Sequence, residues 1–330
     1  MDKLYRVLII GCGQLGSRHL QAVALIPQVS EIEIVDSRPE GLDLGRQRLA
    51  EISDSNPKAR FRWLSSLDKA GKGGDLCIVA TQADVRCELV YEIAKTLGYS
   101  SFLVEKIVAQ SSREYEELMD FAAARGLSVW VNCKQRAEPL NKHIKGKIDQ
   151  SEPIAFSVVG GNHGLATNGI HIADLFTFFD GTSHIYGAGS VIEKVVYPSK
   201  RGPHLFDLSG TLCGYSRKGS HFVLSYFPCG KSPDHLSVVT SSIRWIVDRQ
   251  LRWAWESEAA SAWQWQPLPF EGNLNVSNMT RVFAGDILSK GECELPTLVE
   301  CYPAHRFILN ELQPHFSKLM GAEVERCPVT

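Results

Sequence analysis

Apolar and polar positions follow two different periods along the first 130 or so residues. Short runs that are apolar on both faces predict buried strands, and they alternate with segments of helical period. The predicted strands are Arg6–Ile10, Glu31–Asp36, Arg60–Leu64, Leu76–Ala80, Ser101–Glu105 and Ser128–Val131. The predicted helices are Gly16–Ala24, Pro39–Ser53, Arg86–Leu97 and Ser112–Arg125. This alternation predicts an N-terminal Rossmann domain, a doubly wound α/β fold around a parallel sheet.

The pattern changes after Lys134. Between Val191 and Phe270 apolar and polar residues alternate with period 2, which predicts a large, mainly antiparallel open sheet with one face in water. Further predicted elements are the strand Ile154–Gly160 and the helices Ile170–Phe179, Val276–Lys290 and Thr297–Phe316. We therefore expect two domains, a Rossmann domain over residues 1–132 and an α+β domain over residues 133–330.

Composition excludes several classes of function. With 44% hydrophobic and 22% charged residues and a net charge of −2, the 330-residue chain offers no electrostatic case for nucleic-acid binding. No apolar run approaches the roughly 20 residues of a membrane helix, and M-D-K-L-Y-R leads directly into a strand. The nine cysteines form no C-x-x-C and no zinc pattern. We predict a cytoplasmic protein with reduced thiols, no membrane contact and no metal.

A glycine loop follows the first predicted strand. V-L-I-I-G-C-G-Q-L-G carries Gly11 for a tight turn, Gly13 for close approach of a pyrophosphate and Gly16 for packing of the helix. Asp36 would accept hydrogen bonds from an adenosine ribose, which favours NAD, whereas Arg38 could instead bind the 2′-phosphate of NADP. Further cofactor-binding candidates in this part are Gln14, Leu15 and Ser37.

One other residue of this region has two competing interpretations. Cys12 lies inside the glycine loop, where it is either a redox-active thiol or a tolerated small residue. Arg46 and Arg48 are expected on a solvated helix face.

Three further segments carry candidate chemistry. Thr81 and Gln82 end the strand L-C-I-V-A-T-Q, where the nicotinamide half of a dinucleotide usually lies. Glu105, a further cofactor-binding candidate, and Lys106 end the strand F-L-V-E-K-I. N-G-I-H-I-A-D-L-F places a histidine and an aspartate, His171 and Asp174, one turn apart at a helix start.

These motifs together resemble the Gfo/Idh/MocA family, named for glucose–fructose oxidoreductase, inositol dehydrogenase and a rhizopine-catabolism protein. The resemblance includes a histidine after the glycine loop (His19), R-A-E-P at 136–139 and F-A-G-D-I-L-S-K-G-E-C-E-L-P at 283–296. It spans nearly the whole chain in the expected order. It implies an NAD(P)-dependent oxidoreductase with a sugar-type substrate and a second domain that forms homodimers or homotetramers.

By this resemblance, Lys106 hydrogen-bonds the reacting oxygen and His171 is the general acid/base, a task that imidazole performs near neutral pH. His19 would support the phosphate loop. Candidates for support or substrate binding are Thr167, Asn168, Asp174, Asn162, His163 and Arg136.

Four positions depart from the family pattern. Gln82 and Ile107 replace prolines, and Arg86 stands where a histidine is common. Thr167 occupies the position, four before His171, where many relatives carry an aspartate that orients the histidine. Loss of that carboxylate should lower the pKa of the imidazole unless another group takes its place.

The leading prediction is hydride transfer between nicotinamide and a secondary alcohol or ketone of a sugar, sugar acid or nucleotide-sugar, with bacterial surface-sugar synthesis as a candidate setting. One alternative is an NAD-dependent glycosidase, in which the cofactor is oxidised and reduced again within each cycle. Another is a non-catalytic sensor or scaffold that binds the dinucleotide. The four departures favour the sensor, whereas retention of both Lys106 and His171 favours an enzyme.

Overall fold

The computed structural model describes residues 3–52, 59–162, 164–228, 232–269 and 275–330. Its contacts divide the chain into two compact units. Unit 1 comprises Met1–Ala109, Arg113–Asn132 and Asn273–Leu298, and unit 2 comprises Gln110–Ser112, Cys133–Gly272 and Val299–Thr330. The predicted boundary after residue 132 coincides with a change of unit, but the segment Asn273–Leu298 belongs to unit 1 rather than to the second part of the chain.

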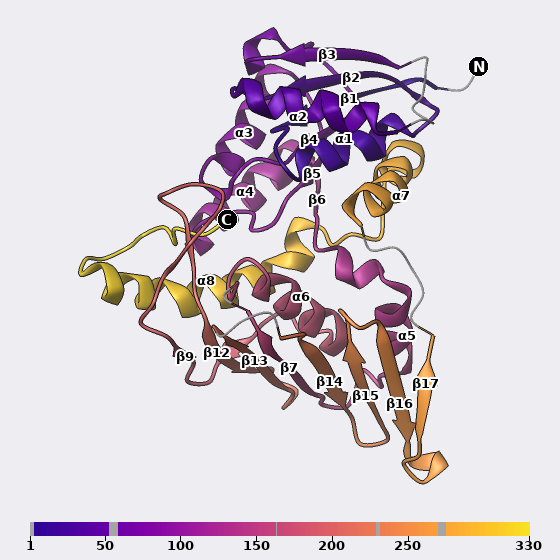
Figure 1. Cartoon of the computed structure of the whole chain (residues 1–330), viewed down its shortest axis with the longest axis vertical. Helices are drawn as coiled ribbons and strands as arrows, with labels where there is room; N and C mark the ends of the chain where they lie inside the picture. Colours follow the sequence, from indigo (N-terminus) through magenta and orange to yellow (C-terminus); the bar gives the residue numbers. More distant parts are fainter. Residues whose placement is uncertain (1–2, 53–58, 163, 229–231, 270–274) are drawn as a thin grey trace. The chain divides into compact units, whose positions relative to one another are not determined.

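Unit 1 contains a six-stranded parallel sheet in the order β3-β2-β1-β4-β5-β6 (Figure 1). Its strands are β1 (Tyr5–Ile10), β2 (Val29–Val35), β3 (Arg60–Leu64), β4 (Leu76–Val79), β5 (Ser101–Val104) and β6 (Ser128–Val131). The chain proceeds outward from β1 to β3 and then returns to β4 beside β1, so the strand order reverses between β1 and β4. Ligands of doubly wound sheets bind at the carboxyl ends of the strands at such a reversal.

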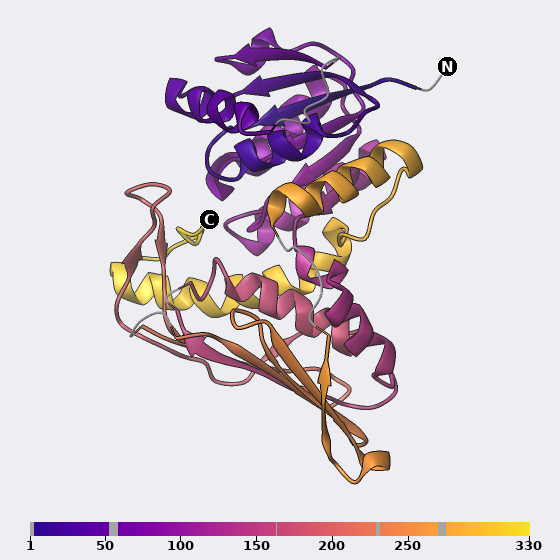
Figure 2. The same cartoon turned by 45° about the vertical axis from the view of Figure 1, so that its right-hand side comes forward.

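The helices of unit 1 are α1 (Gly16–Ala24), α2 (Pro39–Ala50), α3 (Ala83–Thr96), α4 (Ser112–Arg125) and α7 (Val276–Lys290). Right-handed crossovers place α1 and α2 on one face of the sheet and α3 and α4 on the other. All residues of α1 except Arg18 are buried, so this helix needs cover on more than its sheet side. The late helix α7 packs against α1 and provides that cover (Figure 2).

Unit 2 contains a nine-stranded sheet in the order β17-β16-β15-β14-β7-β13-β12-β8, with β9 also paired to β12. Its strands are β7 (Ala155–Gly161), β8 (Tyr186–Gly187), β9 (Val191–Ile192), β12 (Gly210–Tyr215), β13 (His221–Phe227), β14 (His235–Val239), β15 (Ile243–Asp248), β16 (Trp253–Glu258) and β17 (Trp265–Leu268). Only the β7–β13 pair is parallel among these strands. A separate hairpin joins β10 (Tyr197–Pro198) to β11 (Phe206–Asp207). The predicted fold class, a Rossmann sheet plus a mainly antiparallel open sheet, is confirmed.

The helices of unit 2 are α5 (Pro139–Lys147), α6 (Gly169–Asp180) and α8 (Leu298–Met320), of which α5 is absent from the sequence prediction. Aromatic rings join α6 to the sheet: Phe176 packs against Phe156 of β7 and Phe222 of β13, with ring centroids 5.6 and 5.3 Å apart. Phe307 of α8 meets Phe222 edge-on at 5.4 Å. These contacts form the core between helices and sheet, and they fix α6, whose first turn carries His171, on the sheet.

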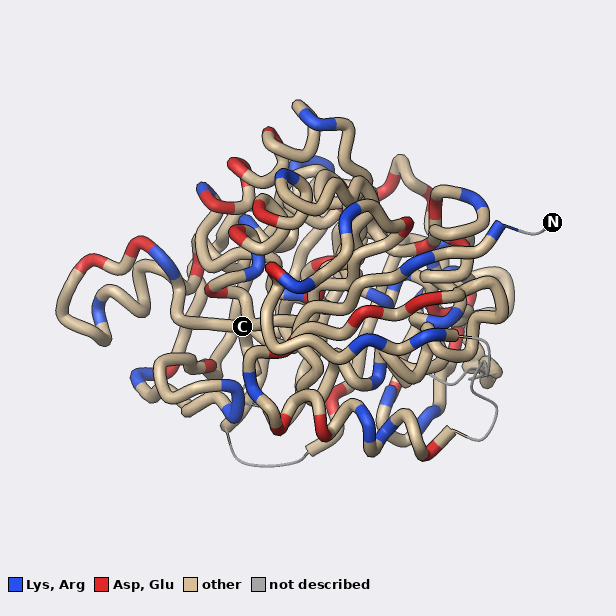
Figure 3. Tube along the Cα trace, turned by 90° about the horizontal axis from the view of Figure 1, so that it is seen from above, with Lys and Arg blue, Asp and Glu red and all other residues tan. Residues whose placement is uncertain are grey.

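Two properties of the described chain bear on function. Acidic and basic residues are interspersed along the trace, without a long run of one sign (Figure 3). Among the described helices, none combines the length and the apolar character needed to cross a membrane.

Three short 3₁₀ turns complete the elements: Leu67–Lys69, Lys134–Ala137 and Ala259–Ser261.

Candidate functional site

The glycine loop joins β1 to α1, and its three glycines have different reasons to be glycine. Gly11 has φ +83°, a conformation that residues with side chains rarely adopt. A Cβ atom on Gly16 would overlap the carbonyl oxygen of Gly11, so the loop closes only without one. A Cβ atom on Gly13 would meet only Nη2 of Arg38, at 3.5 Å. The fold therefore requires the first and third glycines, whereas the space at Gly13 suits an incoming ligand.

The residues after β2 form a compact polar group beside this loop. Asp36 Oδ2 accepts the backbone N–H of Cys12 at 2.8 Å, and Oδ1 accepts the backbone N–H of Arg38 at 2.9 Å. The Asp36 side chain is only 4% exposed, while that of Arg38 is 65% exposed and lies 3.4 Å from Oδ1 through Nε. The carboxylate thus holds the loop in place, and the guanidinium is the charged group that faces solvent.

Arg48 of α2 also contacts the glycine loop, contrary to the expectation of a solvated helix face. Its Nη1 donates to the carbonyl oxygen of Gln14 and to Oγ of Ser17, each at 2.6 Å, and its Nη2 donates to Oε1 of Gln14. Ser17 in turn donates to the carbonyl oxygen of Gly13 at 2.6 Å. Nothing local in the sequence distinguishes Arg48 from its charged neighbours, because only the packing of α2 on α1 brings it here.

The Cys12 thiol is fully buried behind the loop. Burial, helped by the negative charge of Asp36, raises the pKa of this thiol to about 12. The nucleophilic form of a cysteine is the thiolate, which is scarce at neutral pH with such a pKa. The structure therefore favours the interpretation of Cys12 as a small buried residue over a redox role.

The carboxyl end of β4 carries an unused polar atom. Oγ1 of Thr81 is buried and has no hydrogen-bond partner among the residues that the structure describes. Arg86 of α3 is fully buried and donates to the carbonyl oxygens of Thr81 and Ile107, so it joins the ends of β4 and β5. Gln82 precedes α3 as its N-terminal cap residue. A buried hydroxyl without a partner at the reversal of the strand order fits a polar ligand group such as a nicotinamide amide.

Glu105, directly after β5, lies at the centre of a buried network. Its Oε1 accepts Nε2 of His19 at 2.9 Å and Nδ2 of Asn132 at 2.6 Å. Nδ1 of His19 lies 2.9 Å from Oγ1 of Thr280 on α7. Burial by itself would raise the pKa of Glu105, but these hydrogen bonds and the charge of Lys106 hold it well below the usual range. The His19 side chain thus joins the end of β5 to α7, and the network includes Asn132 and Thr280, which sequence reasoning missed.

We expect Glu105→Gln to destabilise the protein by about 2 kcal/mol at neutral pH. Because the pKa of Glu105 is lower when folded than its ordinary value of 4.5, its ionised form stabilises the fold above that pH, and this contribution is lost as the pH falls further. Urea unfolding of both proteins at neutral and acid pH measures the difference. The surface variant Glu117→Gln, which removes an exposed pair with Arg113, is the control. A difference that stays constant down to acid pH would contradict the assignment.

Lys106 follows Glu105 and is 6% exposed, and the peptide bond to Ile107 is cis. In unit 2, His171 lies in the first turn of α6 and its Nδ1 is shielded from solvent. The structure thus places both predicted catalytic residues at the ends of regular elements, one in each unit.

Thr167, in the turn before α6, is bound by a carboxylate that sequence reasoning missed. Oγ1 of Thr167 donates to Oδ2 of Asp207, which also accepts the N–H of Thr167 at 3.1 Å. Oδ1 of Asp207 accepts the N–H of Ala166 at 2.9 Å. Burial raises the pKa of Asp207 despite these hydrogen bonds. A carboxylate therefore reaches the turn where many relatives carry their own aspartate, but it comes from β11.

Other predicted support residues bind one another. Oδ1 of Asn162 accepts the N–H of Gly164 at 2.8 Å and Nδ2 of Asn168 at 3.3 Å, and both asparagines are partly or fully accessible. His163 lies outside the described residues. The turn before α6 thus presents two amide side chains beside Thr167.

Arg136 and Asp174 form a buried ion pair with two hydrogen bonds, of 2.6 and 2.8 Å. Burial alone would lower the pKa of Arg136, but the charge of Asp174 raises it further above its ordinary value. Sγ of Cys133 and Sγ of Cys301 lie within 4.8 Å of an Asp174 oxygen, as in a metal site. Since Arg136 already binds both oxygens of Asp174, we interpret this group as a structural pair that anchors α6.

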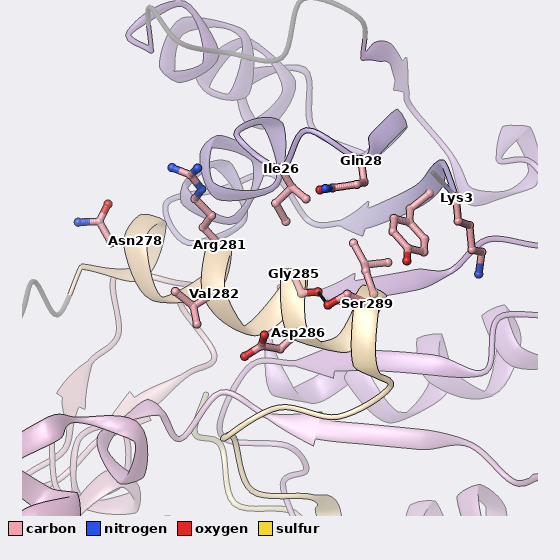
Figure 4. A pocket seen from close by; sticks show the side chains of 11 residues that line it. Lys3, Ile26, Gln28, Asn278, Arg281, Val282, Gly285, Asp286 and Ser289 are labelled. Atoms are coloured by element: carbon pink, nitrogen blue, oxygen red, sulfur yellow. Dashed lines mark hydrogen bonds between the residues drawn. The ribbon is translucent and has the colours of Figure 1, made fainter. Parts of the chain in front are cut away.

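The pocket in Figure 4, about 760 Å³ in volume, lies elsewhere in unit 1. Residues of α7, among them Arg281, Asp286 and Ser289, line it together with Ile26 and Gln28, which follow α1. None of the predicted site residues lines it. Its lining residues Ile26 and Gln28 follow the C-terminal end of α1, whereas the glycine loop precedes the N-terminal end, so we assign the pocket no part in the predicted chemistry.

No protein-family model matches the sequence, and no curated protein matches it. Solved structures do match. A UDP-N-acetylglucosamine 3-dehydrogenase from Acidithiobacillus ferrooxidans is 15% identical, with a TM-score of 0.66 over 99% of this chain and 98% of the other. An oxidoreductase from Agrobacterium radiobacter in complex with NAD+, L-tartaric acid and magnesium is 14% identical, with a TM-score of 0.72 and coverages of 92% and 94%.

A third structure is a 3-ketoreductase from Actinomadura kijaniata in complex with NADP, 17% identical, with a TM-score of 0.69 over 93% of this chain and 96% of the other. At these identities the likeness concerns the fold. The chain has the fold of NAD(P)-dependent oxidoreductases of the Gfo/Idh/MocA type, as the sequence resemblance predicted.

Proposed function

We propose that the protein is an NAD(P)-dependent oxidoreductase that transfers a hydride between nicotinamide and a secondary alcohol or ketone of a sugar-type substrate. The observation that carries this proposal is the glycine loop. Its first and third glycines are required by the backbone, whereas the position of Gly13 is open although the fold itself does not need glycine there. An open position between two structurally required glycines, at a reversal of strand order, is what a bound pyrophosphate demands.

The residues present fit a dinucleotide along the carboxyl ends of the strands. The N–H groups of the loop and the start of α1 would bind the phosphates, and Thr81 would use its buried hydroxyl toward the nicotinamide half. When bound, the cofactor supplies the hydride chemistry, and the protein supplies position and electrostatic field. Glu105, whose Oε1 accepts His19 and Asn132, would hold the end of β5 beside the cofactor.

Lys106 and His171 are the proposed catalytic residues. Oxidation of an alcohol requires a base for the hydroxyl proton, and an imidazole performs this task near neutral pH. The ammonium of Lys106 would stabilise negative charge that develops on the same oxygen. Asp207 supplies, through Thr167, the carboxylate that the sequence alone lacked at this turn.

The substrate class follows from the resemblance and from the chemistry of the related structures, which include a UDP-N-acetylglucosamine 3-dehydrogenase and a 3-ketoreductase. The test incubates the purified protein with either cofactor form and a panel of sugars, sugar acids and nucleotide-sugars while absorbance at about 340 nm and products are followed. Net formation or loss of reduced cofactor supports the proposal. Glycoside cleavage without a net change in reduced cofactor identifies the glycosidase. Bound cofactor without turnover of any compound in the panel identifies the sensor.

Arg38 gives a testable choice between the two cofactors. Both oxygens of Asp36 accept backbone hydrogen bonds, and Arg38 presents an exposed guanidinium next to Gly13. These contacts favour binding of a 2′-phosphate, and hence NADP(H), although Asp36 by itself favours NAD. We expect Arg38→Ala to weaken NADPH binding about tenfold or more and NADH binding much less.

Fluorescence titration of both reduced cofactors measures this effect. Arg46→Ala, which removes a guanidinium of α2 that pairs with Asp43, is the matched control. Tighter binding of NADH than of NADPH to the unmodified protein, with no change on Arg38→Ala, would return the preference to NAD.

We further propose a cytoplasmic homo-oligomer. The described cysteines are all free thiols, which suits a reducing compartment. In unit 2, Tyr215, Phe227, Trp253 and Trp255 lie on sheet strands with 38% or more of each residue exposed, as in a subunit interface. Trp263, which precedes β17, is also 39% exposed. Light scattering tests the proposal, because a mass near 36.6 kDa would mean a monomer.

A further inference from the structure

A second pocket, about 570 Å³ in volume, lies in unit 2 where α6 ends. This volume is typical of small-molecule sites. Three cationic side chains, Arg217, Lys218 and Arg306, line it together with one carboxylate, Asp180. They come from three separate parts of the chain: the turn between β12 and β13, the third turn of α8 and the end of α6. The lining therefore carries excess positive charge.

Two of these cations are held in place through a chain of aromatic contacts. Nε of Arg217 donates to the hydroxyl of Tyr186 at 2.7 Å. The rings of Tyr186 and His184 pack with centroids 4.0 Å apart, and Nδ1 of His184 accepts Nη2 of Arg306. Each contact uses one nitrogen of a guanidinium group. The remaining nitrogens of Arg217 and Arg306 have no hydrogen-bond partner within the described ranges.

The single carboxylate does not neutralise these groups. Oδ1 of Asp180 lies 3.1 Å from Nζ of Lys218 and also accepts the hydroxyl of Ser220. Nζ of Lys218 additionally donates to the carbonyl oxygen of Asp180 at 2.6 Å, so the two residues are bound to each other. The charges of Arg217 and Arg306 thus remain without a counter-ion in the described part of unit 2.

The positive charge of the pocket also affects the pKa of a neighbouring lysine, Lys145. Burial, reinforced by the charge of Lys218, lowers the pKa of Lys145 to about 8. Its Nζ donates to the carbonyl oxygen of Phe179 at 3.2 Å, close to the end of α6. A lowered lysine pKa is what an excess of positive charge nearby produces, so this observation agrees with the cationic lining of the pocket.

We propose that this pocket binds a phosphate or diphosphate group of a small molecule. Guanidinium groups present paired N–H donors that match the oxygens of phosphate, and two of them suit a doubly charged group better than a single carboxylate. Because the contacts that fix Arg217 and Arg306 exist without the ligand, little side-chain ordering remains to be done on binding. The site is separate from the glycine loop, which belongs to unit 1, and it does not depend on the function proposed above.

The test uses pyrophosphate as the probe, in a protein whose glycine loop is blocked. Gly13→Asp places a carboxylate at the open position of the loop, where a side chain meets only Arg38. We expect the Gly13→Asp protein still to bind pyrophosphate in isothermal titration calorimetry. Adding Arg217→Gln or Arg306→Gln should weaken that binding about tenfold or more.

The matched control is Arg113→Gln in the same background, since it removes an exposed guanidinium of α4. It should leave pyrophosphate binding unchanged. Arg217 is exposed, so Arg217→Gln decides the question even where Arg306→Gln disturbs packing against Tyr302. Absence of pyrophosphate binding to the Gly13→Asp protein, or equal affinity with and without Arg217, overturns the proposal.

Discussion

Lys106→Met and His171→Ala should each lower turnover by about a hundredfold or more while cofactor affinity stays close to that of the unmodified protein. The reason is that neither side chain belongs to the glycine loop or to the group around Asp36. Lys106→Met keeps the aliphatic stem that fills its nearly buried position and removes only the ammonium. His171→Ala removes the ring proposed to take the substrate proton.

Steady-state kinetics with the substrate found in the panel, together with cofactor titration, measure both effects. Lys290→Met, on the surface of α7, and His221→Ala, at an exposed position of β13, serve as controls for loss of a charge and of a ring. Unfolding curves show that each variant is folded. Rates like those of the unmodified protein in both variants would remove the assigned roles, while cofactor binding without turnover in any protein would favour the sensor.

The pH dependence adds a finer test of the carboxylate at Asp207. If Asp207 favours the protonated imidazole through Thr167, Thr167→Val should shift the acidic limb of the kcat profile to lower pH. The backbone bonds from Ala166 and Thr167 to Asp207 remain in this variant, so a purely structural role predicts no shift.

Gly16→Ala has the largest expected effect on stability. A Cβ atom at this position would overlap the carbonyl oxygen of Gly11, and that atom belongs to backbone held by its own tight turn. No side-chain rotation relieves the clash, so α1 or the loop must move. We expect a loss of about 3 kcal/mol or more in the free energy of unfolding, together with loss of cofactor binding.

Two matched glycine variants show whether the effect is steric. Gly13→Ala should fold with nearly unchanged stability, because its Cβ meets only the flexible end of Arg38, yet bind the cofactor more weakly. Gly285→Ala, in the middle of α7, has open space around its Cβ and should gain about 0.5 kcal/mol from helix propensity. Thermal unfolding of the Gly16→Ala, Gly13→Ala and Gly285→Ala proteins measures their order of stability. Equal stability of Gly16→Ala and Gly13→Ala would contradict the packing argument.

Local patterns were sufficient for most elements. The six strands of unit 1 lie within one or two residues of their predicted bounds, since a strand buried on both faces is a short apolar run bounded by polar residues. α5 was missed because the segment Pro139–Lys147 is short and carries four charged or histidine side chains among few apolar ones. The placement of α7 in unit 1 also escaped prediction. Its amphipathic period predicts a helix but does not show which element the helix packs against. That element is α1, which is almost entirely buried.

The candidate site divides in the same way. Backbone requirements are local, so spacing alone identified Gly11 and Gly16, and strand ends alone indicated Thr81, Glu105 and Lys106. Hydrogen-bonding partners that come from distant segments of the chain could not be predicted from the sequence. Examples are Asp207 at the turn before α6 and Arg48 on the glycine loop.

The sequence by itself determined the class of fold and the glycine loop, because each depends on residue type at a short, fixed spacing. The two residues proposed for proton transfer and charge stabilisation follow from the family resemblance. Only the tertiary structure decided which charged side chains are paired within the protein and which can contact a ligand. Asp36 and Arg38 differ in this respect, as do Asp174, bound to Arg136, and Arg217, which faces the second pocket. The physical reason is that a charge acts on a ligand only if folding leaves it without a closer partner, and that partner is generally remote along the chain.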